Sequence, residues 1–252
     1  MKPYISLVLS FTLIGLVACN SDSKDTNDTG TTPVDTGTTT ATTTDTATTT
    51  TDTATATDTA TTDTGGETEP TYDAGISIQD NLGNGVPVLS ILEHHEVSEL
   101  YGLDHEGGYI FHIDEVTGAG MVSHSITDSE PTHWNDFSNP APDLELGSEI
   151  GDGEPNTNAI VGALGTDVYA ARYAYDAEIN GFTDWFLPSI DELTAVYENL
   201  HLAGLGDAAS GYSYWSSTDE ATGAWVIYFA NGNTYTPNKT HDHHHALPVR
   251  NF

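Results

Sequence analysis

Residues 20–70 form a threonine-rich segment that limits what this chain can fold into more than any other feature. Twenty-four of these 51 residues are threonine, mostly in Asp-Thr and Ala-Thr repeats, with no aromatic residue and one larger aliphatic residue, Val34. Such a segment cannot bury enough apolar area to offset the entropy lost on ordering. We therefore predict that residues 19–70 are a disordered stalk, about 40 Å from end to end as a flexible coil.

The residues before the stalk have the pattern of an export signal. Lys2 is followed by an apolar run from Tyr4 to Val17, and the run ends at Leu16-Val17-Ala18-Cys19. A short cationic start, an apolar core and small residues predict a signal peptide over residues 1–18 and not a membrane span. The last four residues resemble a bacterial lipobox, which implies cleavage before Cys19 and its acylation. Several acyl chains would anchor the protein stably.

Asn20 and Ser21 follow the cysteine, and by resemblance to enteric sorting rules they favour an outer-membrane or cell-surface location over the inner membrane. The alternative is an ordinary secretory signal in which Cys19 is incidental.

The charge balance excludes several classes of partner. The formal net charge is −33, with 5 Lys and Arg against 38 Asp and Glu. Nucleic-acid binding and electrostatic binding to anionic lipid both need clustered cations, which this chain lacks. We therefore expect no nucleic-acid partner, and we expect contact with the membrane only through the lipid anchor. Residues 71–252 hold 28 of the acids, all four Trp and three cations: Arg172, Lys239 and Arg250. This composition and length predict one globular domain over 71–252.

The domain's pattern predicts strands flanking a block of helices, which is typical of an α+β fold. Strands are expected over 109–114 and 119–124, paired as a hairpin, and over 212–217, 224–229, 234–236 and 246–250, with a two-residue turn at Asn231-Gly232. The spacing of apolar residues predicts helices over 160–168 and 170–179. The firmest helix follows Pro188, where Ser189 and Glu192 form a capping-box pattern.

Several phrases of the domain match one family. They are Gly107-Gly-Tyr-Ile-Phe111, Gly118-Ala-Gly-Met-Val122, Asn156-Thr-Asn-Ala-Ile-Val161, Gly181-Phe-Thr-Asp-Trp-Phe-Leu-Pro-Ser-Ile-Asp-Glu-Leu193, Tyr214-Trp-Ser-Ser-Thr218 and Pro248-Val-Arg-Asn-Phe252. Across about residues 75–252 the chain resembles the Lcl C-terminal domain family, a family of unknown function found at the end of a bacterial collagen-like adhesin. The resemblance implies a C-type-lectin-like domain with two to three helices and a small antiparallel sheet.

The resemblance also implies an adhesin-like role in ligand binding. The adhesin's domain is associated with sulfated polysaccharides, which an acidic domain with three cations would repel. We therefore expect a neutral glycan or a protein as the ligand, with calcium or zinc as the candidate cofactor. By fold analogy the binding surface lies between Ser216 and His245, and its candidate residues are Asn231, Asn233, Tyr235 and Asn238. The alternative for Asn231 is a role in the turn alone.

Two groups of side chains suggest metal ions. In an extended segment His241, His243 and His245 would share one face beside Asp242, a donor set that suits zinc, nickel or copper. A transition-metal-binding protein of the surface or periplasm is therefore the alternative function, and a loop of neutral histidines is the simpler reading. Asp219 with Glu220, or Asp152 with Glu154, could bind calcium, although charged runs are usually solvated faces.

The remaining motif residues favour structural roles. Acylated Cys19 leaves no thiol in the mature domain, and no Ser, His and Asp form a nucleophile-elbow pattern, so we do not expect an enzyme. We expect Trp185, Trp215 and Trp225 in the core, and Asp184 and Ser189 as caps of turns or of the helix start. Arg250 should pair with a carboxylate.

Overall fold

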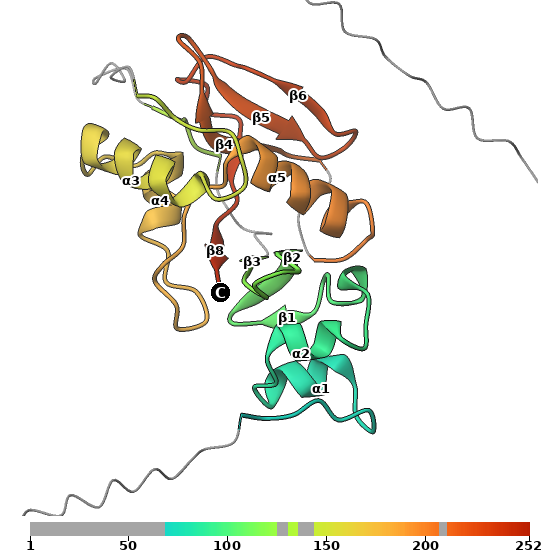
Figure 1. Cartoon of the computed structure of the whole chain (residues 1–252). Coiled ribbons are helices and arrows are strands. Elements are labelled where there is room, and N and C mark those ends of the chain that lie inside the picture. The colour runs from blue at the N-terminus through green and yellow to red at the C-terminus, as the bar shows by residue number, and fades with distance from the viewer. Residues whose placement is uncertain (1–68, 125–130, 136–143, 207–210) are drawn as a thin grey trace, which may run out of the picture. The chain divides into compact units, whose positions relative to one another are not determined.

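The computed structural model describes residues 69–124, 131–135, 144–206 and 211–252. The predicted signal peptide, Cys19 and the stalk as far as Thr68 lie outside these residues. The described part mixes helices with largely antiparallel sheets, which confirms the α+β class. It contains five α-helices and two four-stranded sheets, more than the two to three helices and one small sheet that we expected (Figure 1). No helix in these ranges is long and apolar enough to cross a bilayer.

The first sheet has the strand order β1-β2-β3-β8 and is antiparallel throughout. Its strands are β1 (Asp104–His105), β2 (Gly108–Ile113), β3 (Gly120–Ser123) and β8 (Val249–Asn251). The predicted hairpin of β2 and β3 is confirmed, with Ile110 opposite Val122. Two short helices, α1 (Ile78–Gly83) and α2 (Val88–Leu92), and the 3₁₀ turn Val97–Glu99 precede the sheet and share its apolar cluster.

The second sheet has the order β6-β5-β4-β7. Strands β4 (Ser213–Asp219), β5 (Ala224–Tyr228) and β6 (Asn233–Tyr235) are antiparallel, whereas β7 (His245–Ala246) runs parallel to β4. Tyr228 pairs with Asn233, so the hairpin loop has the four residues 229–232 and the expected two-residue turn is wrong. The prediction failed because asparagine and glycine are common in hairpin loops of several lengths, so their presence does not fix the loop length.

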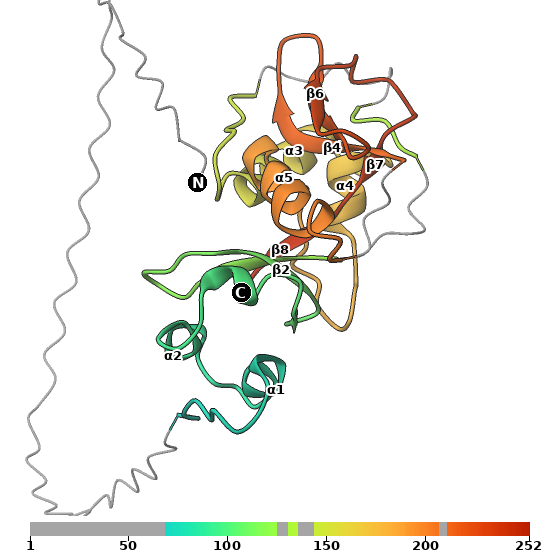
Figure 2. The ribbon, with the colours of Figure 1, turned by 90° about the vertical axis from the view of Figure 1, so that its right-hand side faces the viewer.

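The single strand predicted over 246–250 is also wrong, because the chain changes sheets there. Residues 245–246 pair with β4, and 249–251 pair with β3 in the other sheet. Pro248 stands between the two strands and cannot donate a ladder hydrogen bond. Figure 2 shows the chain passing from β7 in the upper sheet down to β8 in the lower one. In β8, Arg250 pairs with Val122 of β3.

The main helices lie between and beside the sheets (Figures 1 and 2). They are α3 (Gly153–Leu164), α4 (Ala170–Tyr175) and α5 (Ile190–Val196), which continues as the π-helical turn Tyr197–His201. Helix α3 begins earlier than predicted and ends before Val168, which is exposed. Helix α4 ends at Tyr175 and not near Ile179, because Ile179 and Phe182 exchange backbone hydrogen bonds across a tight turn at Asn180 (φ 52°) and Gly181 (φ 86°).

Helix α5 contacts strands of both sheets and so joins the two halves of the described domain. Its Leu193 and Val196 are fully buried against Phe111 of β2 and Tyr214 of β4. Trp185 and Trp215 are buried, as predicted, but Trp225 is only half-buried. The expectation for Trp225 fails because Ala224 and Val226 take the buried positions on either side of it, and successive strand residues point to opposite faces.

The predicted capping box at the start of α5 is confirmed and extends further than the motif implies. The backbone N–H of Ser189 donates to Glu192 Oε2 at 2.8 Å, and Oε1 accepts from the N–H groups of Gly151 (2.8 Å) and Gly153 (3.3 Å). Burial raises the pKa of Glu192, and the three N–H donors oppose that rise. A Cβ at Gly153 would lie 2.1 Å from Oε2, so the glycine leaves the space that the carboxylate fills.

Replacing Glu192 with glutamine should lower the free energy of unfolding by about 2 kcal/mol, because the amide nitrogen would face at least one buried backbone N–H. Urea denaturation followed by circular dichroism measures the change. Glu198→Gln is the matched control, since Glu198 is exposed in the turn that continues α5. Equal stability of the two variants would contradict the role of Glu192 in joining α5 to α3.

Candidate functional site

A polar pocket of about 280 Å³ opens where α3, α4 and the segment after α4 meet. Its exposed lining residues are Glu154, Asn158, Tyr175, Thr183 and Asp184. Its buried lining residues are Thr157, Trp185 and Phe186. The exposed lining is therefore rich in hydrogen-bonding groups, and the buried lining includes two aromatic rings. We call this the polar pocket.

The first two turns of α3 build one side of the polar pocket. Glu154, Thr157 and Asn158 are three and four positions apart, which places them on one face of the helix. The Thr157 hydroxyl donates to the Leu187 carbonyl (3.2 Å) and accepts from the Leu187 N–H (2.9 Å). These two bonds hold the segment 183–187 against α3, so Thr157 positions the opposite side of the pocket and has little capacity left for a ligand.

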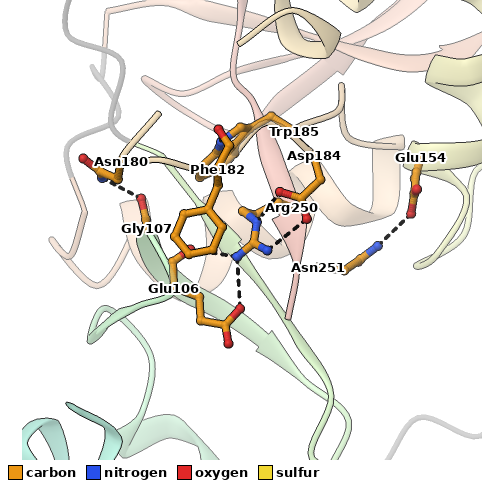
Figure 3. A network of polar contacts seen from close by, with 9 residues as sticks. All are labelled: Glu106, Gly107, Glu154, Asn180, Phe182, Asp184, Trp185, Arg250 and Asn251. Atoms are coloured by element: carbon orange, nitrogen blue, oxygen red, sulfur yellow. Dashed lines mark hydrogen bonds and ion pairs between the residues drawn. The ribbon is translucent and has the colours of Figure 1, made fainter. Parts of the chain in front are cut away.

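Arg250 holds Asp184 in place through hydrogen bonds (Figure 3). Its Nε donates to Asp184 Oδ1 at 2.8 Å and its Nη2 to Oδ2 at 2.9 Å, while Nη1 donates to the carbonyl of Glu106 (2.8 Å) and to Glu106 Oε2 (3.1 Å). The Phe182 ring centroid lies 4.0 Å from the guanidinium carbon. Hydrogen bonds from Arg250 lower the pKa of Asp184. The predicted pairing of Arg250 is confirmed, and four of its five N–H groups are used.

Asn251, which follows Arg250 in β8, contacts Glu154, the second carboxylate of the pocket. Asn251 donates from Nδ2 to Glu154 Oε2 at 3.0 Å, as Figure 3 shows. Two consecutive residues of one strand thus position Glu154 and Asp184, which belong to segments 30 residues apart in sequence. Asp184 was expected to cap a turn; the structure gives it an ion pair 66 residues away in sequence instead.

Every Lys and Arg that follows residue 68 pairs with a carboxylate. Arg172 Nε lies 2.6 Å from Asp176 Oδ2, one helical turn on. Lys239 Nζ contacts Asp219 Oδ2 and lies 4.7 Å from the centroid of the Trp134 ring. With Arg250 these are the domain's three cations. None of them presents an uncompensated positive charge to an anionic ligand.

The four residues that the sequence suggested for ligand binding lie on β6 and the loops beside it, and none lines the polar pocket. Asn231 Oδ1 accepts from the Asn233 N–H (3.0 Å), and Asn238 Oδ1 accepts from the N–H and hydroxyl of Thr240. Both amides therefore close local turns, as the alternative reading held for Asn231. Tyr235 is exposed, and its hydroxyl lies 2.9 Å from Ser213 Oγ.

The histidine cluster does not present the three residues that we expected on one face. His241 and Asp242 are exposed, as is His243 at 81% of its side chain. His245 begins β7, is buried and stacks on Tyr212 with 3.9 Å between ring centroids. His241 instead lies 6.4 Å from His243 and 6.1 Å from His244, measured between ring centroids.

No three or more His, Cys, Asp or Glu residues of the described ranges form a group that could hold a metal ion. Transition-metal binding at 241–245 stays a prediction.

His244 is the most unusual residue of the cluster. It is 7% exposed, and neither ring nitrogen has a hydrogen-bond partner among the described residues. Its ring meets Trp215 edge-on with 4.7 Å between centroids. Burial, with smaller contributions from the three neighbouring histidines, lowers the pKa of His244 to about 4. The ring is therefore a neutral core residue at physiological pH.

The predicted calcium ligands are also placed by the structure. Asp219 is largely buried in its ion pair with Lys239, so a calcium ion there would have to displace the ammonium group. Glu220 is exposed. Asp152 Oδ2 accepts from the Glu149 N–H at 2.8 Å, and Glu154 pairs with Asn251. Calcium binding stays a prediction for both pairs.

The described part of the chain is thus an α+β domain with a polar pocket. The family model described as the Lcl C-terminal domain matches residues 129–250, which confirms the resemblance over that part of the chain. All residues of the polar pocket and Arg250 lie inside the match, whereas Glu106 and strands β1 to β3 precede it. No curated protein matches the chain.

Proposed function

We propose that this protein is a lipid-anchored, surface-displayed binding protein in which the stalk carries a C-type-lectin-like domain for a neutral glycan. The lipobox-like end of the signal segment and the threonine-rich residues 19–70 support the anchor and the display. The match of residues 129–250 to the Lcl C-terminal domain supports the adhesin-like role that the resemblance implies.

The pairing of all three cations is the observation that carries the choice of ligand. Sulfated and carboxylated glycans are held by arginine and lysine side chains with donors to spare. Here Arg172, Lys239 and Arg250 are each neutralised by an aspartate. The surrounding acidic surface would repel an anionic ligand further. Hydroxyl groups of a neutral sugar, by contrast, can donate to carboxylates and amides without meeting a charge penalty.

An array of neutral and sulfated glycans tests the proposed function, with the full chain applied in calcium, in chelator and in zinc. We expect retention of at least one neutral glycan and no selective retention of sulfated ones. Binding that survives chelation would show that no cation is needed. If no glycan is retained in any of the three conditions, the protein binds something other than a glycan, and a protein or metal ligand replaces this proposal.

A further inference from the structure

We propose that the polar pocket binds a single neutral pyranose ring of the glycan. The surface formed by β6 and its neighbouring loops is then not the glycan-binding site. This inference rests on the proposed function and adds the site and the size of the recognised unit. The pocket's volume of about 280 Å³ is slightly below the range of sites for drug-sized molecules, which starts near 300 Å³. One sugar ring is the size of ligand that fits such a site, with the rest of the glycan left in solvent.

The exposed lining of the pocket carries the hydrogen-bonding groups that a sugar needs. Glu154 and Asp184 are acceptors, whereas Asn158 and Thr183 can both donate and accept. Adjacent ring hydroxyls of a pyranose also donate and accept, so this mixture can satisfy them in pairs. Each oxygen of Asp184 takes one hydrogen bond from Arg250 and keeps a further lone pair for a ligand.

Asp184 is held in place before any ligand binds. It accepts two parallel hydrogen bonds from the buried Arg250, whereas Glu154 accepts one exposed hydrogen bond from Asn251. A ligand therefore does not have to order Asp184, which reduces the entropic cost of binding. The same contacts make Arg250 and Asn251 positioning residues, since they act through the carboxylates and neither lines the pocket.

Tyr175 gives the pocket an exposed aromatic surface. Tyr175 is the last residue of α4 and is 43% exposed. The guanidinium carbon of Arg172 lies 5.5 Å from the centroid of the Tyr175 ring. The apolar C–H face of a sugar ring packs well against an aromatic side chain that presents both an apolar body and a polar tip. Trp185 and Phe186 extend the aromatic lining inward, where both are buried.

The charge around the pocket selects against anions. The charge of Asp184 is compensated by Arg250, and no cation other than Arg250 contacts a pocket carboxylate among the described residues. A sulfate or carboxylate in the pocket would thus face two carboxylates, and no Lys or Arg of the described part of the chain lines the pocket. A neutral ring meets no such repulsion, and a compact cationic group is the competing occupant that the test must distinguish.

Nuclear magnetic resonance of the full chain tests the site, with four neutral probes: the methyl glycosides of glucose, galactose, mannose and N-acetylglucosamine. At least one probe should shift the signals of Asn158, Thr183 and Asp184. Asn158→Ala and Tyr175→Ala should each weaken its binding roughly three- to tenfold, the range for loss of one hydrogen bond or one packing contact. Asn233→Ala is the matched control at an exposed asparagine of β6, and its dissociation constant should stay within about twofold of the wild type.

Three outcomes would overturn the inference. Shifts confined to β6, with weaker binding by Asn233→Ala, would move the site to the sequence-predicted surface and leave the proposed function standing. Binding of Nα-acetyl-lysine methylamide in the pocket, without any glycoside, would assign the pocket to a cationic group. No shift with any glycoside, while the array retains a neutral glycan, would exclude a one-ring site. An array that retains no glycan instead removes the proposed function itself.

Discussion

Replacing Arg250 with alanine is expected to lower the free energy of unfolding by about 2 to 3 kcal/mol, because it removes charge-assisted hydrogen bonds to Asp184 and Glu106, whose carboxylates both stay in contact with solvent. The guanidinium is buried, and its contacts join β8 to Asp184 beside the polar pocket and to Glu106 beyond β1. Without it, the carbonyl of Glu106 loses a buried donor and the Phe182 ring loses its packing partner. Arg250→Lys should recover only part of the loss, because an ammonium group cannot form the two parallel bonds to Asp184.

Arg172→Ala is the matched control for the loss of an arginine. Arg172 also pairs with an aspartate, but this pair spans one turn of a surface helix, and the side chain of Arg172 is 25% exposed against 7% for Arg250. Exposed pairs of this kind contribute little to stability. Guanidinium denaturation of the wild type, Arg250→Ala, Arg250→Lys and Arg172→Ala measures the difference. Similar stabilities of Arg250→Ala and Arg172→Ala would show that the contacts of Arg250 with Asp184 and Glu106 do not stabilise the domain.

Acidification from pH 6.5 to pH 4 is expected to lower the free energy of unfolding by about 3 kcal/mol through His244 alone. The folded pKa of His244, about 4, lies below its unfolded value of 6.5. Between these values the unfolded chain binds the proton and the folded chain does not, so stability falls as the pH falls. The contribution is intact above pH 6.5 and is lost by about pH 4.

The comparison with His244→Phe isolates this contribution, because other groups titrate equally in both proteins. Burial also lowers the pKa values of His105 and His112, and their effects cancel in the difference. A phenyl ring should be tolerated because neither ring nitrogen of His244 has a hydrogen-bond partner in the described part of the chain. His243→Phe is the control at an exposed neighbour. Thermal unfolding is measured with chelator present from pH 7 to pH 4. The midpoint temperature should fall with decreasing pH equally steeply for the wild type and His243→Phe, and less steeply for His244→Phe. Equal slopes for all three would contradict the buried, neutral state of His244.

Elements set by nearby residues were predictable from the sequence. The pair Ser189 and Glu192 marks the start of α5 by a motif four residues long, and the hairpin of β2 and β3 follows from two apolar runs around a short turn. The extra bonds from Gly151 and Gly153 to Glu192 were not predictable, because they come from a segment about 40 residues away that no local pattern connects to α5.

The division of residues 245–251 between two sheets shows the same limit. Ala246 to Arg250 is a continuous apolar and polar run that suits one strand, and only the pairing of Val249 with Ser123 and of Ala246 with Trp215 separates it into two. Pro248 was the local signal for the break. The helix predicted over 170–179 failed for a related reason, since a tight turn at Asn180 and Gly181 competes with the last helical turn.

The candidate site was only partly accessible to sequence reasoning. A scarce arginine in an acidic domain must have a carboxylate partner, so the pairing of Arg250 was predictable, but the choice of Asp184 depends on where β8 lies. The polar pocket draws its residues from three separate segments of the chain. The family phrases that contain Asn156 to Asn158 and Thr183 to Phe186 were the available signal, and their shared pocket is a property of the folded chain.

The most direct test of this account is a paired titration of the full chain with one neutral oligosaccharide that the array retains and with the same oligosaccharide after sulfation. We expect the neutral form to bind with an affinity that changes little between low and high salt, because no ion pair forms, and we expect sulfation to abolish binding. Tighter binding of the sulfated form, weakening steeply with added salt, would contradict the account, since it would require a cationic surface that the pairing of Arg172, Lys239 and Arg250 denies.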